Sequence, residues 1–212
     1  MNIEGHARRT GLKGAEVIPL VTRVLSNEEI LRGLERGDTI AADAFYERFG
    51  DTINRRVWRL LGADADHDDV VQQVFENVLS SIRGLRDPSS LGDWIAGVAV
   101  NTVRRELRRR KVRRILVLVR EVPDAPALDG GPEEGANARR FYAALDRMRI
   151  DDRIVFALRF VDGNTLEDTA RLASCSLSTA KRRVERARKA FLSEAGQDPI
   201  LASLMKEVDH GR

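Results

Sequence analysis

Apolar residues in the first half of this chain recur at steps of three and four positions, and this spacing is the feature that most limits its fold. Between residues 64 and 85 the apolar positions are Val70, Val71, Val74, Phe75, Val78, Leu79 and Ile82. This pattern puts the apolar side chains on one face of a helix, whereas a half-buried strand would need them at alternate positions. Similar stripes begin at Phe45 and at Trp94, and no alternation of strand period extends beyond a few residues. The sequence therefore predicts an all-α fold.

The segment Glu121–Asn137 divides the chain, because it contains three prolines, three glycines and no basic residue. Such a composition predicts a flexible linker that holds neither helix nor strand. We therefore expect two small helical domains. The predicted parts are an N-terminal extension over residues 1–26, a first domain over 27–114, a linker over 115–137, a second domain over 138–195 and a C-terminal tail over 196–212. A capped helix should begin at Ser26, since Glu29 follows three positions later.

Charge is segregated along the chain, although 36 Lys and Arg against 33 Asp and Glu leave a net charge of only +3. Residues 111–120 hold four basic residues and no acid, residues 121–137 hold five acids and no basic residue, and residues 138–195 hold 13 basic residues against eight acids. Two basic regions separated by an acidic spacer indicate a polyanionic partner, or a solvated surface if nothing binds there.

The remaining composition excludes several classes of protein. With a single cysteine, Cys175, no disulfide can form within the chain, and the three histidines are too scattered for an ordinary zinc site. No apolar run approaches the roughly 20 residues that cross a bilayer. There is no phosphate-binding glycine loop and no plausible Ser/His/Asp set. We expect a soluble cytoplasmic protein that is not inserted in a membrane and is not an enzyme, with no cofactor, no metal and no catalytic residue.

A cationic stretch follows the third apolar stripe. Between Arg104 and Arg114, eight of eleven residues are basic and Glu106 is the only acid. A cationic helix face binds phosphates and releases their counterions. A solvated helix end or a basic linker would have the same composition, so this stretch alone indicates no more than a polyanion.

The segment from Thr165 to Phe191 has the pattern of a helix-turn-helix. Thr165 is a candidate N-cap, Ser174–Ser176 interrupts the periodicity, and a second helix should run from Leu177 with Ala180, Val184, Ala187 and Phe191 inward. This helix carries Lys181, Arg182, Arg183, Arg186, Arg188 and Lys189. Such an arrangement is typical of a recognition helix in the major groove, and an ordinary helical hairpin is the alternative.

Three motifs in order resemble those of bacterial sigma factors. They are Asp-Asp-x-x-Gln-x-x-Phe from Asp68, Trp-x6-Asn-x4-Glu-Leu-Arg-Arg-Arg from Trp94, and Thr-x-Lys-x-Arg-x-x-x-Ala-Arg from Thr179. Residues 27–111 are similar to region 2 and residues 138–195 to region 4, so the chain resembles the extracytoplasmic-function (ECF) group of the sigma-70 family.

The resemblance implies a partner for each motif. The clamp helices of the polymerase β′ subunit would bind Asp68, Asp69, Gln72, Gln73 and Phe75. The −10 element of the promoter would bind Trp94, Asn101, Arg104, Arg105 and Arg108. The −35 element would bind Ser178, Thr179, Lys181, Arg182, Arg183 and Arg186. Further implied partners are the β flap of core RNA polymerase and an anti-sigma factor, and a compact free form would keep the DNA-binding faces covered.

Two departures from the family pattern matter. Ala96 and Gly97 stand where members often have Tyr and Arg, which leaves Trp94 as the only aromatic residue of that helix and fewer stacking platforms for an unpaired base. Ser174 stands where the turn usually has Gly, so it must adopt the turn conformation.

Alternatives from other classes remain. A stand-alone helix-turn-helix regulator would use the second half alone and would leave the basic helix of the first half without a role. A pure interaction protein would have solvated basic faces and would not bind DNA. A metal at His67 among its neighbouring aspartates is much less plausible than a solvated helix start.

Overall fold

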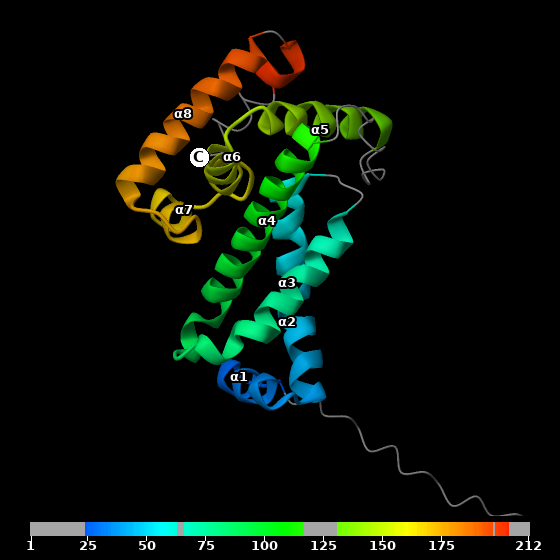
Figure 1. Ribbon diagram of the computed structural model, residues 1–212, viewed down its shortest axis with the longest axis vertical. Coiled ribbons are helices and arrows are strands. Elements are labelled where there is room, and N and C mark those ends of the chain that lie inside the picture. The colour runs from blue at the N-terminus through cyan, green and yellow to red at the C-terminus, as the bar shows by residue number, and fades with distance from the viewer. Residues whose placement is uncertain (1–23, 63–65, 117–130, 197, 204–212) are drawn as a thin grey trace, which may run out of the picture.

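The structure is a computed structural model that describes residues 24–62, 66–116, 131–196 and 198–203 (Figure 1). The first half contains α1 (Asn27–Arg36), α2 (Thr39–Leu61), α3 (His67–Ser81), the short 3₁₀ turns η1 (Ile82–Gly84) and η2 (Pro88–Ser90), and α4 (Leu91–Leu116). The second half contains α5 (Gly131–Asp146), α6 (Ile150–Phe156), the π turn η3 (Ala157–Val161), α7 (Leu166–Leu172) and α8 (Leu177–Ala195). All regular elements in the described ranges are helical, and the predicted all-α class is confirmed.

The local signals in the sequence set several of these helix ends. Ser26 and Glu29 form the predicted capping box, in which the Ser26 hydroxyl accepts from the Glu29 amide and the Glu29 carboxylate accepts from the Ser26 amide. The turns η1 and η2 separate α3 from α4. There the Asp87 carboxylate accepts from the Ser89 amide and caps η2.

The predicted linker over 115–137 is wrong at both of its ends. Helix α4 continues to Leu116, and α5 begins at Gly131, so residues 131–137 are helical. Pro132 does not oppose this, because a residue in the first helical turn needs no amide hydrogen and proline has the φ angle of a helix. The rest of the linker, most of the N-terminal extension and the end of the tail lie outside the described residues.

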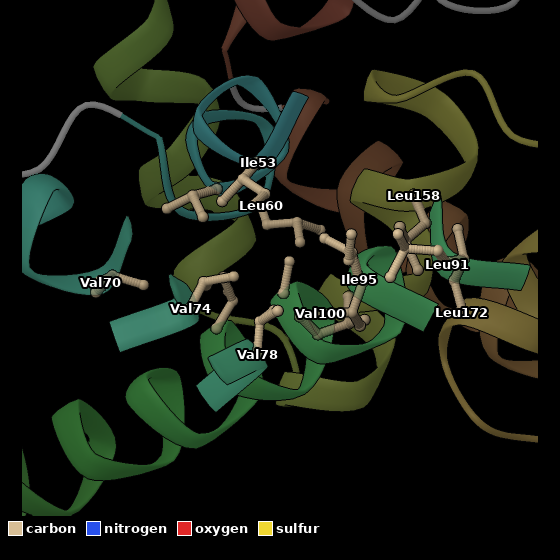
Figure 2. Close-up of a cluster of buried hydrophobic side chains, with 14 of the residues drawn as sticks. Ile53, Leu60, Val70, Val74, Val78, Leu91, Ile95, Val100, Leu158 and Leu172 are labelled. Carbon is tan, nitrogen blue, oxygen red and sulfur yellow. The ribbon is translucent and has the colours of Figure 1, made fainter. Parts of the chain in front are cut away.

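One hydrophobic core joins the two halves. This core contains Phe45, Ile53, Val74 and many other buried side chains of the first half. The same cluster includes six residues of the second half: Ile154, Val155, Ala157, Leu158, Leu172 and Ala173. Figure 2 shows Leu158 and Leu172 beside Leu91 and Ile95 of α4. Burial of each such side chain contributes about 1.5–3 kcal/mol, so the contact between the halves is a substantial part of the fold.

A second, smaller core lies within the second half. Phe156 of α6 and Phe191 of α8 stack with their ring centroids 5.1 Å apart, and both are fully buried. Leu201 is also buried in this cluster, so the beginning of the predicted C-terminal tail packs on the second half.

The helix-turn-helix has the predicted form. The Thr165 hydroxyl accepts from the Asp168 amide at 3.0 Å and caps α7, and the Ser176 hydroxyl accepts from the Thr179 amide at 3.2 Å and caps α8. Ser174 has φ = 52°, the left-handed conformation that the turn requires and that glycine adopts more easily. Ala180 is fully buried, as expected for the inward face of α8.

Candidate polymerase and nucleic-acid interfaces

The candidate polymerase-binding residues follow one side of α3, next to a groove of about 600 Å³ between α2 and α3. Asp68, Gln72 and Phe75 line this groove together with Tyr46 of α2. The ring centroids of Tyr46 and Phe75 lie 5.3 Å apart, and Tyr46 is 64% exposed. Asp69 and Gln73 are exposed on the same helix outside the groove lining. Apolar rings between carboxylates suit a helical partner that offers apolar and basic side chains.

The cations of α4 fall into groups with different partners. Glu106 is buried, and its carboxylate accepts from Arg109 at 2.7 Å and from Arg110 at 2.8 Å. Burial would raise the pKa of Glu106, but the hydrogen bonds and charges of the two arginines outweigh it and lower the pKa. The single acid of the basic stretch is therefore ionised and neutralises part of it, whereas Arg105 and Lys111 are exposed.

Arg104 is largely withdrawn from solvent. Its guanidinium donates to the Asn101 side-chain oxygen at 2.6 Å and to the Ala173 carbonyl oxygen of the second half at 2.8 Å. Burial lowers the pKa of Arg104, although the neighbouring Asp151 opposes this shift. Trp94 packs partly buried against the shared core, and Asn101 and Arg108 are exposed. The five candidate −10 residues share one helix, and the second half of the protein covers part of their surface.

The candidate −35 residues differ in exposure along α8. Ser178, Lys181, Arg182 and Arg186 are exposed, while Thr179 and Arg183 are half-buried. Arg186 donates to both carboxylate oxygens of Asp152 at 2.6 and 2.5 Å, and Arg183 donates to Asp151 at 3.2 Å. Both aspartates lie in the first turn of α6.

Several polar contacts between the halves were not predicted from the sequence. Arg153 of α6 is buried and donates to the carbonyl oxygens of Leu60 and Leu61. The Asp162 carboxylate accepts from Arg59 at 2.6 Å and pairs with Arg56 at 3.1 Å. Further contacts are the pair between Arg171 and Asp93 and the hydrogen bonds from the Tyr142 hydroxyl to the carbonyl oxygens of Trp58 and Arg59.

His67 belongs to the packing of α2 against α3. It is buried, its Nε2 lies 2.6 Å from the side-chain oxygen of Asn54, and its ring contacts that of Trp58. In the described ranges, no three His, Cys, Asp or Glu residues gather closely enough to hold a metal ion. None of the helices described is long and apolar enough to span a bilayer.

Comparison with known proteins assigns a class to each half. Residues 45–113 match the family model for sigma-70 region 2, and residues 138–191 match the model for sigma-70 region 4. The fold is similar to CnrH in its complex with the cytosolic domain of CnrY, with a TM-score of 0.55, 19% identity and coverage of 80% of this chain and 96% of that one. A similar likeness, with a TM-score of 0.53, 22% identity and coverage of 76% and 96%, holds for the sigma factor RpoE from Bartonella quintana in its complex with the anti-sigma factor NepR.

Curated relatives give the group within this class. The chain is 32% identical over 136 residues to the ECF RNA polymerase sigma factor EcfG of Rhodopseudomonas palustris, which covers 60% of this chain and 71% of that one. It is 31% identical over 146 residues to the ECF sigma factor SigX of Bacillus subtilis, with coverage of 64% and 74%. The chain therefore belongs to the ECF group of the sigma-70 family.

Membership of this family establishes the general function. A sigma factor binds core RNA polymerase and directs transcription initiation to promoters. The alternative of a stand-alone regulator is not favoured, because the region 2 match over residues 45–113 would have no role in such a protein.

Proposed function

We propose that three surfaces of this protein each bind a different partner during transcription initiation. The side of α3 that carries Asp68, Asp69, Gln72, Gln73 and Phe75 binds the β′ clamp helices. Residues Trp94, Asn101, Arg104, Arg105 and Arg108 of α4 bind the −10 element. Residues Ser178, Thr179, Lys181, Arg182, Arg183 and Arg186 of α8 bind the −35 element. The second half also contacts the β flap, and the protein works in the cytoplasm, where core polymerase is found.

The observation that carries the −35 assignment is the outer face of α8. Ala180, Ala187 and Phe191 bury the inner face, and Arg182 and Lys189 lie on the exposed side. The Ser176 cap positions the beginning of this helix after a tight turn. A capped helix with basic residues on its free face can enter the major groove and place its first turns against base edges.

The −10 assignment rests on the continuity of α4 with the core of the first half. Ile95, Val100 and Val103 fix the helix from the inside, and Arg105 and Arg108 lie on its outer side. Gly97 has no atom within 4 Å of the position a Cβ would take, so this part of the helix offers room for a base or a larger side chain. Trp94 is the one aromatic ring that α4 supplies there.

An anti-sigma factor is a further partner of this protein. The comparison structures of CnrH and RpoE are both complexes, and the protein bound to RpoE is the anti-sigma factor NepR. A partner of this kind would regulate access to the polymerase-binding groove and to the cations of α4 and α8.

A binding scan over promoter variants tests the α8 assignment with core polymerase present. Arg182→Ala should lower affinity by about 1–3 kcal/mol and relax the preference at one −35 base pair. Lys189→Ala, two turns further along the same exposed face, should weaken binding equally for all sequences and reduce the salt dependence by about one counterion. Equal, sequence-independent losses in both variants would remove base recognition from α8.

A further inference from the structure

Three arginines from two helices converge on a single carboxylate. Oδ1 of Asp151 lies 3.3 Å from Nε of Arg104 and 3.9 Å from Nη2 of Arg108, both on α4. Oδ2 of the same residue lies 3.2 Å from Nη2 of Arg183 on α8. These arginines belong to the two surfaces proposed for the −10 and −35 elements. One acidic side chain therefore joins both surfaces.

We propose that Asp151 is an internal substitute for DNA phosphate that holds the two DNA-binding surfaces together in the free protein. This inference rests on the proposed function of α4 and α8. While the three arginines share this carboxylate, they cannot place their guanidinium groups on phosphates. Separation of α4 from α6 releases Arg104 and Arg108 from this carboxylate, while Arg183 stays beside it in the second half. Promoter DNA would favour this open form by offering phosphates in place of the carboxylate.

The ion pairs of Asp151 with α4 are suited to release because they are poorly aligned or exposed. Nε of Arg104 is buried and within ion-pair range of Asp151, but it makes no hydrogen bond there. Arg108 is 60% exposed and at the limit of ion-pair distance. An exposed or misaligned ion pair contributes little to stability and weakens with salt. A duplex, which offers several aligned phosphates, can therefore compete with this single carboxylate.

The neighbouring aspartate shows why this role falls to Asp151. Asp152 is buried and takes both of its arginine hydrogen bonds from Arg186, so it joins α6 to α8 within the second half. Asp151, one residue earlier, faces α4 as well as α8. Of the two acids, only the one that faces both halves can respond to their separation.

The test compares core-free DNA binding by the full-length protein and its Asp151→Asn variant. Asparagine keeps the shape of the side chain but loses the charge that attracts the three arginines. The variant should bind a nonspecific duplex at least about fivefold more tightly than the wild type at low salt. Asp43→Asn is the matched control, because the same exchange on the exposed surface of α2 changes the net charge equally and lies outside both α4 and α8.

The single cysteine gives a second readout that needs no DNA. Cys175 is half-buried and packs against the core that the two halves share. If Asp151 holds the closed form, Asp151→Asn should raise the rate at which a thiol reagent labels Cys175 in the native protein, and Asp43→Asn should not. The inference is overturned if the Asp151→Asn variant binds DNA no more tightly than the Asp43→Asn variant, or if labelling of Cys175 is as slow as in the wild type.

A transcription assay separates this inference from the proposed function. If wild type and Asp151→Asn both direct core polymerase to the same promoters while core-free binding is unchanged, the role of Asp151 is wrong and the function stands. If neither protein gives core polymerase any promoter preference, the assignment of α4 and α8 to the promoter is wrong, and the inference is overturned with it.

Discussion

The guanidinium of Arg153 donates a hydrogen bond to the carbonyl oxygen of Leu61 at 3.0 Å, and this contact joins α6 to the end of α2. A second hydrogen bond reaches Leu60 at 3.2 Å, and Asp146 pairs with the same guanidinium. The last carbonyl groups of a helix have no partner within it and carry a partial negative charge. An arginine from the second half therefore caps a helix of the first.

Loss of this cap should destabilise the contact between the halves. Arg153→Met keeps the length of the side chain but leaves the buried carbonyl oxygens of Leu60 and Leu61 without a donor. We expect the free energy of unfolding to fall by about 3 kcal/mol, measured by urea denaturation followed by circular dichroism. Arg147→Met is the control, because Arg147 is 69% exposed and pairs with Glu194 inside the second half. Its effect should stay within about 0.5 kcal/mol, and equal effects in both variants would contradict the role of Arg153.

Gly62 should tolerate no side chain. Its φ of 82° and ψ of −173° belong to a region that is essentially restricted to glycine, and a Cβ there would overlap the ring of Tyr142. Gly62→Ala should destabilise the protein by about 3 kcal/mol. Gly37→Ala is the matched control: φ is 75°, but no atom lies within 4 Å of the added Cβ. Gly37→Ala should lower the free energy of unfolding only by the backbone strain, about 1 kcal/mol. A loss as large as that of Gly62→Ala would show that the overlap with Tyr142 contributes nothing.

Asp162 should make the stability of the protein sensitive to acid. Burial would raise its pKa, but hydrogen bonds from Arg59 and Asn164 and the charge of Arg56 outweigh it, so the pKa lies below the ordinary 3.8. A lowered pKa in the folded state stabilises the protein above pH 3.8, and this contribution disappears as the pH falls through the folded value. Asp162→Asn should therefore cost about 2 kcal/mol at pH 7, with the difference from wild type shrinking below pH 3.8.

Urea denaturation at a series of pH values measures this difference. Asp43→Asn, the same exchange on the exposed surface of α2, should alter the free energy of unfolding by less than about 0.5 kcal/mol throughout. A difference for Asp162→Asn that stays constant down to pH 2.5 would contradict the linkage.

The surface of α3 should be essential for polymerase binding. Asp69 and Gln72 are exposed one turn apart, away from the buried Val70 and Val74. Replacing both with Lys should abolish coprecipitation of core polymerase without changing helical content, because neither side chain contributes to the core. Glu35→Lys, an exposed charge reversal on α1, should leave binding intact. Coprecipitation of core polymerase by the double variant at wild-type strength would show that this surface of α3 does not bind polymerase.

Local patterns predict the helices and the turn correctly, because periodicity and capping act within a few residues. The Thr165 cap and the turn at Ser174 are examples. The beginning of α5 escapes prediction because Pro132 has the signal of a helix breaker, although a first-turn proline is compatible with a helix. Leu79 belongs to the apolar stripe of α3 by its spacing but is 47% exposed, beside a shallow cavity against α1.

The contacts between the halves could not be predicted from the sequence in the same way. Arg104 and Asp151 are far apart in the chain, and in the sequence Asp151 is simply an acid at a helix start, where the helix dipole alone would favour it. The same holds for Arg153, which differs in no local signal from the exposed Arg147. Only the packing of α6 against α4, and of the adjoining η3 against α2, gives these residues their roles.

The most direct test of the central claim is run-off transcription on genomic fragments with purified core RNA polymerase and this protein. Discrete start sites should appear only when the protein is present, and they should disappear when Asp69 and Gln72 are both replaced by Lys. If the protein alone bound specific duplex sites tightly, and its addition gave core polymerase no new start sites, the protein would be a stand-alone regulator and the account would be contradicted.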